Sequence, residues 1–354
     1  MQAPEFLQKL VAFYSPSGRE EEVANFVKQT AQAQGFTKAK VDHFNNVICE
    51  IGQGPRTVIL LGHLDTVKPF LPIKVVKDTL YARGAVDAKG PFAAFFYAAL
   101  QAGQKTQQLK IIVIGAAGEE AHGIGARVLV EKIARPLAVI IGEPSGLNGI
   151  TLGYKGVCSL EFFKRKEALH SANLSEQNVI EEGIAFTEHL RGFVQKFNQG
   201  KTVWSGLQYR VEKFVFNTVN SVEQIKIRVR FRTPLNFDFG SIKELVQQHA
   251  SKAEVSYLQS WGSEEACLSP KNTILTRAFL PALRAEQLTP RFVVKTGTAD
   301  MNTFCKAFPQ VPIVAYGPGD SRLDHTPQEH LAYADLTQAI KVLTRVLLKL
   351  DQAA

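Results

Sequence analysis

Paired cysteines and long apolar runs are both missing from this chain of 354 residues. Its four cysteines, Cys49, Cys158, Cys267 and Cys305, are far apart and form no C-x-x-C pair, which favours free thiols over disulfides or a sulfur metal site. No stretch approaches the roughly 18 uninterrupted apolar residues of a membrane span. The opening segment, MQAPEFLQKL, lacks a basic region followed by an apolar one, so no signal peptide is expected. These absences predict a cytoplasmic protein without a membrane segment.

A dense run of lysine and arginine with interleaved aromatic residues is also absent, so nucleic acid is not expected as a partner. The net charge is nevertheless +8, and a basic balance of this kind favours acidic partners. A merely soluble surface is the alternative interpretation. We expect the basic excess in the middle third of the chain, at Lys155, Lys164, Arg165, Lys166, Lys213, Lys226, Arg228, Arg230 and Arg232.

Strand-like apolar runs alternate with helical segments over residues 1–153. TVILLGHLD, LKIIVIGAAGEE and LAVIIGEPSG are typical of buried strands, and PFAAFFYAALQAG is typical of a buried helix that opens with a proline. This alternation predicts an α/β fold with a mixed, mostly parallel sheet and flanking helices. The same character returns over residues 268–354.

The pattern changes between these two parts. In GVCSLEFFKRK and EQIKIRVRFRTP, apolar and polar residues alternate, as they do in half-exposed antiparallel strands. Helical stretches lie between such runs. The sequence therefore predicts an inserted α+β domain at residues 154–267, and one catalytic domain that is built from residues 1–153 and 268–354.

Acidic and imidazole residues follow the apolar runs of the first part. His63 and Asp65 end the first run, Glu119 and Glu120 the second, and Glu143 the third. Because ligands gather at the carboxyl ends of parallel strands, we expect these side chains at one edge of the sheet.

Two further residues of the same kinds lie in loop-like segments, Asp87 in RGAVDAKG and His325 in DHTPQEHL. Imidazoles together with carboxylates are the ligand mixture of a hydrolytic Zn²⁺ site. Taken one at a time, each has a simpler interpretation: a turn aspartate for Asp87, a loop histidine near the surface for His325, and a turn cap for Asp65.

The adjacent pair Glu119 and Glu120 is the sharpest signal. Two neighbouring glutamates would repel each other in a dry site unless a cation lies beside them. With a metal present, one can bind it while the other takes a proton from water. The alternative is a helix N-terminus, where the helix macrodipole favours acidic residues.

The order of HLD, DAKG, EE, GEPS and a late HTPQEH resembles the dinuclear zinc amidohydrolase and peptidase family, which includes acetylornithine deacetylase, succinyl-diaminopimelate desuccinylase and related carboxypeptidases. The resemblance covers nearly the whole chain and implies two divalent ions, with Zn²⁺ favoured and Co²⁺ or Mn²⁺ as alternatives. It further implies that Glu119 is the general base and that Asp65 orients His63. By motif, one metal would be held by His63, Asp87 and Glu143, and the other by Asp87, Glu120 and His325.

The resemblance also implies that the inserted domain is a lid or dimerisation domain, and hence that the protein is a homodimer. In the family this domain carries a histidine that stabilises the oxyanion across the dimer, and His170 in KRKEALHSA is the candidate, although the usual preceding glycine is absent. Arg232 would hold a substrate carboxylate by a bidentate pair, unless it is only a solvated strand residue. Asn220 corresponds loosely to a family N-V-I-P stretch, but SVEQ follows it here.

The segment KTGTADMNTF favours one branch of the family and makes Gly297 and Thr298 candidate substrate-binding residues. It resembles hydrolases that release lysine or ornithine from an acidic amino-group carrier protein, of the LysW type, in lysine and arginine biosynthesis. A basic middle third would then steer that carrier. Three alternatives stay open: a free-standing deacylase acting on acetyl-ornithine, acetyl-lysine or succinyl-diaminopimelate, a dipeptidase or aminopeptidase, and a carrier-binding module without catalysis.

Overall fold

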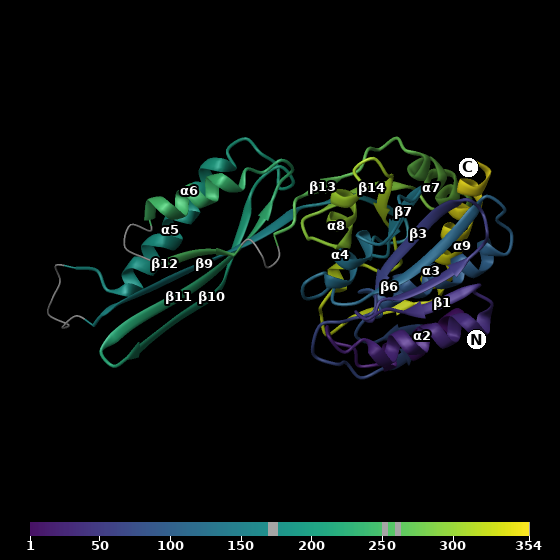
Figure 1. Cartoon of the computed structure of the whole chain (residues 1–354), viewed down its shortest axis with the longest axis horizontal. Coiled ribbons are helices and arrows are strands. Elements are labelled where there is room, and N and C mark those ends of the chain that lie inside the picture. The colour runs from purple at the N-terminus through teal and green to yellow at the C-terminus, as the bar shows by residue number, and fades with distance from the viewer. Residues whose placement is uncertain (169–175, 250–253, 259–262, 354) are drawn as a thin grey trace. The chain divides into compact units, whose positions relative to one another are not determined.

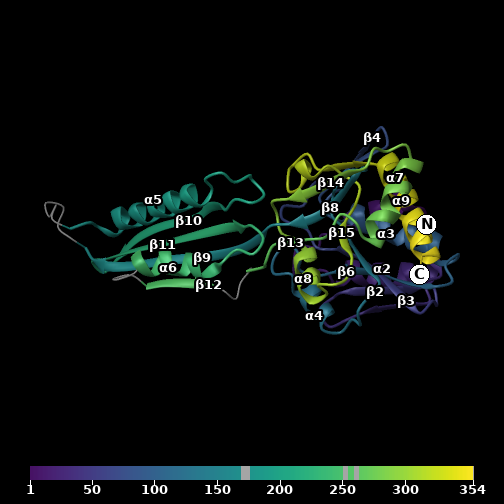
Figure 2. The ribbon, with the colours of Figure 1, turned by 90° about the horizontal axis from the view of Figure 1, so that it is seen from above.

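The computed structural model describes residues 1–168, 176–249, 254–258 and 263–353, and the chain forms two compact units (Figures 1 and 2). The larger unit consists of Met1–Gly153, Leu268–Val294 and Ala299–Ala354. The inserted unit consists of Tyr154–Cys267 and Lys295–Thr298. Among the described residues, no helix is both long and apolar enough to cross a membrane.

A sheet that has nine strands within the described residues forms the centre of the larger unit. Its order is β1-β2-β6-β3-β7-β15-β8-β13, and β14 pairs with β8. β3 runs parallel to β6 and β7, and β15 runs parallel to β7, so the predicted mixed, mostly parallel sheet is confirmed. The strands are β1 (Lys38–Val41), β2 (Val47–Ile51), β3 (Arg56–His63), β6 (Leu109–Ala116), β7 (Ala138–Ile141), β8 (Gly149–Tyr154), β13 (Cys267–Leu268), β14 (Arg291–Lys295) and β15 (Ile313–Ala315).

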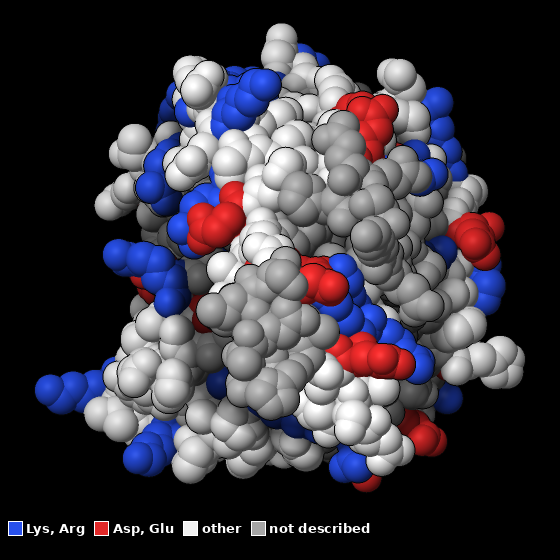
Figure 3. Space-filling view, turned by 90° about the vertical axis from the view of Figure 1, so that its left-hand side faces the viewer, with Lys and Arg blue, Asp and Glu red and all other residues white. Residues whose placement is uncertain are grey.

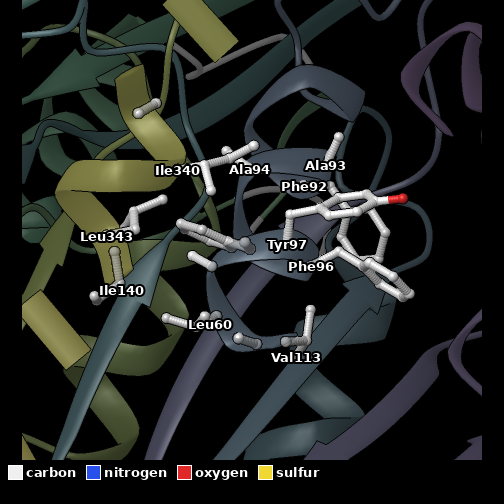
Figure 4. Close-up of a cluster of buried hydrophobic side chains, with 14 of the residues drawn as sticks. Leu60, Phe92, Ala93, Ala94, Phe96, Tyr97, Val113, Ile140, Ile340 and Leu343 are labelled. Carbon is white, nitrogen blue, oxygen red and sulfur yellow. The ribbon is translucent and has the colours of Figure 1, made fainter. Parts of the chain in front are cut away.

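Helices pack against this sheet, and the most deeply buried is α3 (Lys89–Gly103). Its alanines and phenylalanines suit burial on all sides, because small and flat apolar side chains fill the space between sheet and helices. Figure 4 shows Phe92 and Phe96 of this helix with Leu60 of β3 and Val113 of β6. The other helices of the unit are α1 (Ala3–Ala12), α2 (Glu21–Gln34), α4 (Ile124–Val130), α7 (Ile274–Ala285), α8 (Asp300–Ala307), the short η1 (Ser321–Leu323) and α9 (Tyr333–Gln352).

A small antiparallel sheet adjoins the loops that lead into α3. It consists of β4 (Lys74–Val76), β5 (Thr79–Tyr81) and β16 (His330–Ala332), in the order β16-β5-β4. β16 brings the last third of the chain beside residues 74–81, because Leu331 pairs with Leu80 and both side chains are buried.

The inserted unit is α+β. Its antiparallel sheet has the order β10-β11-β9-β12, and Phe162 stacks on Phe186 of α5 at a ring-centroid distance of 4.5 Å in its core. Asn178 caps α5 with a capping box that includes Glu181, which satisfies the first amides of the helix. The elements are β9 (Gly156–Glu167), α5 (Val179–Phe197), β10 (Gln208–Val219), β11 (Val222–Thr233), α6 (Phe239–His249) and β12 (Glu254–Leu258).

The nine basic residues expected in the middle third do not make the inserted unit strongly basic. Residues 154–267 contain 15 Lys and Arg and 13 Asp and Glu, a net charge of +2 out of the chain's +8. Several of the basic side chains are paired with carboxylates of the same unit: Lys226 and Arg228 lie 2.5 and 3.2 Å from Glu161, and Arg230 lies 2.9 Å from Glu212. Figure 3 shows blue and red side chains interleaved on the face in view. Five of the nine cations on the strands of the inserted sheet thus have a carboxylate partner within the unit: Lys164, Lys166, Lys226, Arg228 and Arg230.

Candidate metal centre

Strand ends and loops of the larger unit bring the predicted polar residues together. His63 is the last residue of β3, Glu119 and Glu120 follow β6, and Glu143 follows β7. Because these three strands are parallel, their carboxyl ends lie at the same edge of the sheet. Asp87 is added by the loop before α3, and His325 by the loop before β16.

A first group of possible metal ligands consists of His63, Asp87 and Glu143, all of them buried. Their ligand atoms lie within 4.8 Å of one another, with Nε2 of His63 3.2 Å from Oδ1 of Asp87 and 3.8 Å from Oε1 of Glu143. Nδ1 of His63 lies 3.0 Å from the main-chain oxygen of Asp65. If Nδ1–H donates there, the lone pair of Nε2 faces the two carboxylates, as a metal-binding histidine requires.

A second group consists of Asp87, Glu120 and His325. Nε2 of His325 lies 3.1 Å from Oδ2 of Asp87 and 3.0 Å from both carboxylate oxygens of Glu120. Asp87 belongs to both groups and directs one oxygen to each histidine, which is the geometry of a carboxylate that bridges two cations. The side chain of His325 is 52 % exposed, so this group is open to solvent on one side.

The clustered carboxylates of the site would be stabilised by bound cations. Burial raises the pKa of Glu119 well above its usual value, and the negative charges of Glu143 and Asp300 add to this effect. Hydrogen bonds with Asp87 and Glu120 raise the pKa of His325 to about 10. The cationic form of His325 thus offsets part of the carboxylate charge in the chain alone. Since carboxylate oxygens and imidazole nitrogens are also the ligands of Zn²⁺, Co²⁺ and Mn²⁺, the residues present fit two such ions.

Asp65, the residue predicted to orient His63, also contacts the loop of the two glutamates. Its fully buried carboxylate accepts hydrogen bonds from the main-chain amides of Glu119 and Glu120, at 3.2 and 3.0 Å, and from the hydroxyl of Ser17 at 2.6 Å. The same side chain therefore holds the loop of the two glutamates beside His63. Neither motif by itself indicated this link between them.

Glu20 is a second buried carboxylate that the sequence patterns did not single out. It is 1 % exposed, and its Oε1 accepts from the amides of Gly18 and Gly118 at 2.9 and 3.0 Å. Gly118 directly precedes Glu119, so Glu20 supports the other end of the same loop. In the sequence it is only the first of three consecutive glutamates, and its partner lies 98 residues away.

We expect Glu20→Ala to lower the free energy of unfolding by about 1–3 kcal/mol, since two amides lose their acceptor. Urea denaturation measures this change. The matched control is Glu21→Ala, which removes the exposed neighbouring carboxylate and should change stability by less than about 0.5 kcal/mol. Equal losses for the two variants would contradict the role assigned to Glu20.

Glu329 is likewise buried. It lies in the HTPQEH motif, but the sequence predicted no role for it. Its carboxylate lies 2.8 Å from Nη1 of Arg83 and accepts from the amides of Val86 and Asp87 at 2.9 and 3.1 Å. It therefore fixes the main chain of the residue that the two metal groups share.

The candidate substrate-binding residues lie in the inserted unit. Nη1 of Arg232 donates to the hydroxyl of Thr298 at 2.5 Å, and Gly297 directly precedes that threonine. Asn220 lies in the tight turn between β10 and β11, with a φ of 50°. It is separated from Arg232 by almost the whole of β11, about 33 Å of extended chain, so the structure does not bring the two together. His170 lies outside the described residues.

Comparisons with known proteins identify the family of the chain. The family model described as Peptidase family M20/M25/M40 matches residues 59–349. A [LysW]-lysine hydrolase of Deinococcus radiodurans is 36 % identical over 355 residues, covering 98 % of this chain and 97 % of that protein. A [LysW]-lysine/[LysW]-ornithine hydrolase of Saccharolobus islandicus is 27 % identical and covers 96 % and 93 %. The crystal structure of an M20 family metallo-carboxypeptidase from Sulfolobus solfataricus has a TM-score of 0.80 at 20 % identity and covers both chains fully.

Proposed function

Because the chain belongs to peptidase family M20/M25/M40, we propose that it is a dinuclear metal-dependent amide hydrolase that releases lysine or ornithine from the terminal glutamate of an amino-group carrier protein in the cytoplasm. The observation that carries the reaction type is the position of Glu119, beside two ligand groups that share Asp87. The substrate is proposed from the relatives, whose names specify lysine or ornithine linked to LysW.

The residues divide the work of hydrolysis as follows. One metal would be held by His63, Asp87 and Glu143, and the other by Asp87, Glu120 and His325. When bound, the metals polarise the scissile carbonyl and lower the pKa of a water molecule. Glu119 takes the proton of that water and delivers it to the leaving amine.

The other assigned residues bind the substrate or hold the catalytic loop in position. Asp65 and Glu20 hold the loop of Glu119 through its amides, so the base stays in place as its charge changes. His170 is proposed to donate a hydrogen bond to the carbonyl oxygen as negative charge develops on it. Arg232 remains the proposed ligand of a substrate carboxylate, with Gly297 and Thr298 beside it, and Thr298 fixes the guanidinium through their hydrogen bond.

Because Asp87 belongs to both ligand groups, variants of the site should lose different numbers of metal ions. The wild-type protein is expected to bind two metal ions per chain, His325→Ala one, and Asp87→Asn fewer than one, because Asp87 serves both groups. Elemental analysis after dialysis against Zn²⁺, Co²⁺ or Mn²⁺ measures the number of ions bound per chain. In a separate sample purified without added metal, the ion that remains bound identifies the native metal. Removal of the metal by a chelator should abolish hydrolysis, and re-addition should restore it. Two ions retained by Asp87→Asn would contradict the shared ligand.

A substrate panel tests the proposed reaction. Carrier-linked lysine, carrier-linked ornithine, acetyl-ornithine and a dipeptide are compared by kcat/KM with the metal-loaded protein. We expect the carrier-linked substrates to exceed the others by at least about 100-fold, or about 2.7 kcal/mol in transition-state stabilisation. Comparable turnover of acetyl-ornithine would instead identify a free-standing deacylase, and comparable turnover of the dipeptide a peptidase. Binding of the carrier without turnover would identify a module without catalysis.

A homodimer is proposed through the edge of the inserted sheet. β10 is the first strand in the order of that sheet, and it is exposed along most of its length, including Val211, Phe214, Val215, Phe216 and Val219. A long apolar edge strand with free backbone groups pairs with other chains unless it is covered. A second copy, running antiparallel, would pair with this strand and cover it. Replacement of Val215 by proline should convert the dimer to a monomer in light scattering, whereas a dimer that persists would place the interface elsewhere.

A further inference from the structure

A mostly exposed segment of the larger unit lies in the chain between two parts of the metal centre. It comprises residues 67–78 and is called the rim segment; it starts two residues after Asp65 and ends nine residues before Asp87. It includes β4 and turns into β5 at Lys77 and Asp78, whose positive φ angles of 47° and 60° are those of a tight two-residue hairpin turn. Figure 2 shows β4 at the outer margin of the larger unit.

The rim segment exposes an unusual number of large apolar side chains. Phe70, Ile73, Val75 and Val76 are between 38 and 51 % exposed. The ring of Phe70 meets that of Tyr14, also exposed, edge to face at a centroid distance of 6.0 Å. Single exposed apolar residues are common on protein surfaces, but a cluster within one short segment is typical of a surface that binds another protein.

The same segment carries free positive charge. Lys68, Lys74 and Lys77 are exposed, and none of them makes an ion pair within the part of the chain that the structure describes. Asp78 is the one acid of the segment. This differs from three cations of the inserted sheet that are paired with carboxylates, Lys226, Arg228 and Arg230. The rim segment of the larger unit therefore offers unpaired positive charge to an acidic partner.

A single guanidinium connects the rim segment to the metal centre. Nε of Arg83 donates to the main-chain oxygen of Pro69 at 3.4 Å, and its Nη1 donates to that of Thr326 at 3.2 Å. Pro69 directly precedes Phe70, and Thr326 directly follows His325. The apolar and basic surface thus begins one side chain away from the solvent-exposed ligand group.

We propose that the rim segment docks the protein part of the carrier-linked substrate. The apolar side chains would contact apolar residues of the carrier, and the three lysines would pair with its carboxylates. This inference rests on the proposed function, because a substrate amine attached to a protein requires a protein-sized surface beside the metals. The charge of the segment specifies the partner chemistry: an acidic protein surface with exposed apolar side chains.

The test reverses the charge of the rim. In a variant with Lys68→Glu, Lys74→Glu and Lys77→Glu, we expect KM for carrier-linked lysine to rise at least about 30-fold with kcat nearly unchanged, and its dependence on ionic strength to weaken. Phe70→Ala should raise KM about tenfold, as loss of a central aromatic contact does. The matched control reverses Lys105, Lys341 and Lys349, which are exposed on the same unit. It changes the net charge equally but leaves the rim intact.

Four other outcomes would contradict either the docking surface or the proposed function. An equal rise in KM for both triple variants would show attraction by net charge alone and would overturn the proposal. So would an equal loss of turnover on carrier-linked lysine and on a short γ-glutamyl-lysine peptide, because the rim would then act on the metal centre. A change of oligomeric state in light scattering would make a second copy the occupant. Failure of the wild-type protein to hydrolyse any carrier-linked substrate would reject the proposed function instead.

Discussion

Replacing Glu119 with glutamine is expected to lower kcat by at least about 1,000-fold while the fold and both metal ions are retained. The carboxylate is the group that takes and returns a proton, and an amide of the same shape cannot do so. Glu119 is also absent from both ligand groups found among the described residues, so its loss should leave the metal content at two per chain. Single-turnover rates with carrier-linked lysine and elemental analysis of the same sample measure the two quantities.

The control for this experiment is Glu120→Gln, the adjacent residue with the opposite expected result. Both oxygens of Glu120 lie 3.0 Å from His325, so its replacement should weaken the second metal group, and added metal should recover part of the activity. Added metal should not rescue Glu119→Gln. If the two variants behaved alike, or if Glu119→Gln stayed near wild type, the division into one base and one ligand would be wrong.

The sequence predicted the metal ligands that lie at or just after the end of a buried strand. His63, Glu120 and Glu143 follow apolar runs, and parallel strands necessarily end at one edge of the sheet. Asp87 and His325 lie in loops, and only the order of the motifs indicated that they join the others. The structure now shows all five within two groups that share Asp87.

The supporting carboxylates could not be predicted in this way. Glu20 accepts from an amide 98 residues away, and Glu329 pairs with Arg83, 246 residues away. A local pattern records the residue type but not a distant amide that the fold brings to it. Nothing near Glu20 distinguishes it from Glu21 and Glu22, although only Glu20 is buried.

The sequence pattern also did not show how charges pair across the inserted sheet. The alternating pattern of β11 shows Lys226, Arg228 and Arg230 on an apparently basic strand. In the antiparallel pair, however, Arg228 lies directly opposite Glu161 of β9, and the register decides which charges meet. A count of basic residues along one strand therefore overestimates the positive charge that a partner can use.

Glu329→Ala is expected to lower the free energy of unfolding of the larger unit by about 3–5 kcal/mol, because it leaves the buried guanidinium of Arg83 without its counter-charge. The side chains of the pair are 4 % and 0 % exposed, so water cannot replace the lost carboxylate. The change also removes the acceptor of the amides of Val86 and Asp87, and metal affinity should fall with stability. Urea denaturation of the metal-free protein separates the first effect from the second, which is measured by titration with Co²⁺.

Two further variants distinguish loss of the charge pair from loss of the amide acceptor. Arg83→Met with Glu329→Leu removes both charges, so it should be more stable than Glu329→Ala, since no buried charge is left unpaired. Its Co²⁺ affinity should remain low, because the amide of Asp87 still lacks a partner. Gln328→Ala, at an exposed neighbouring position, should change neither quantity. If the double variant recovered full metal affinity, the ion pair alone would matter, and the carboxylate of Glu329 would have no part in positioning Asp87.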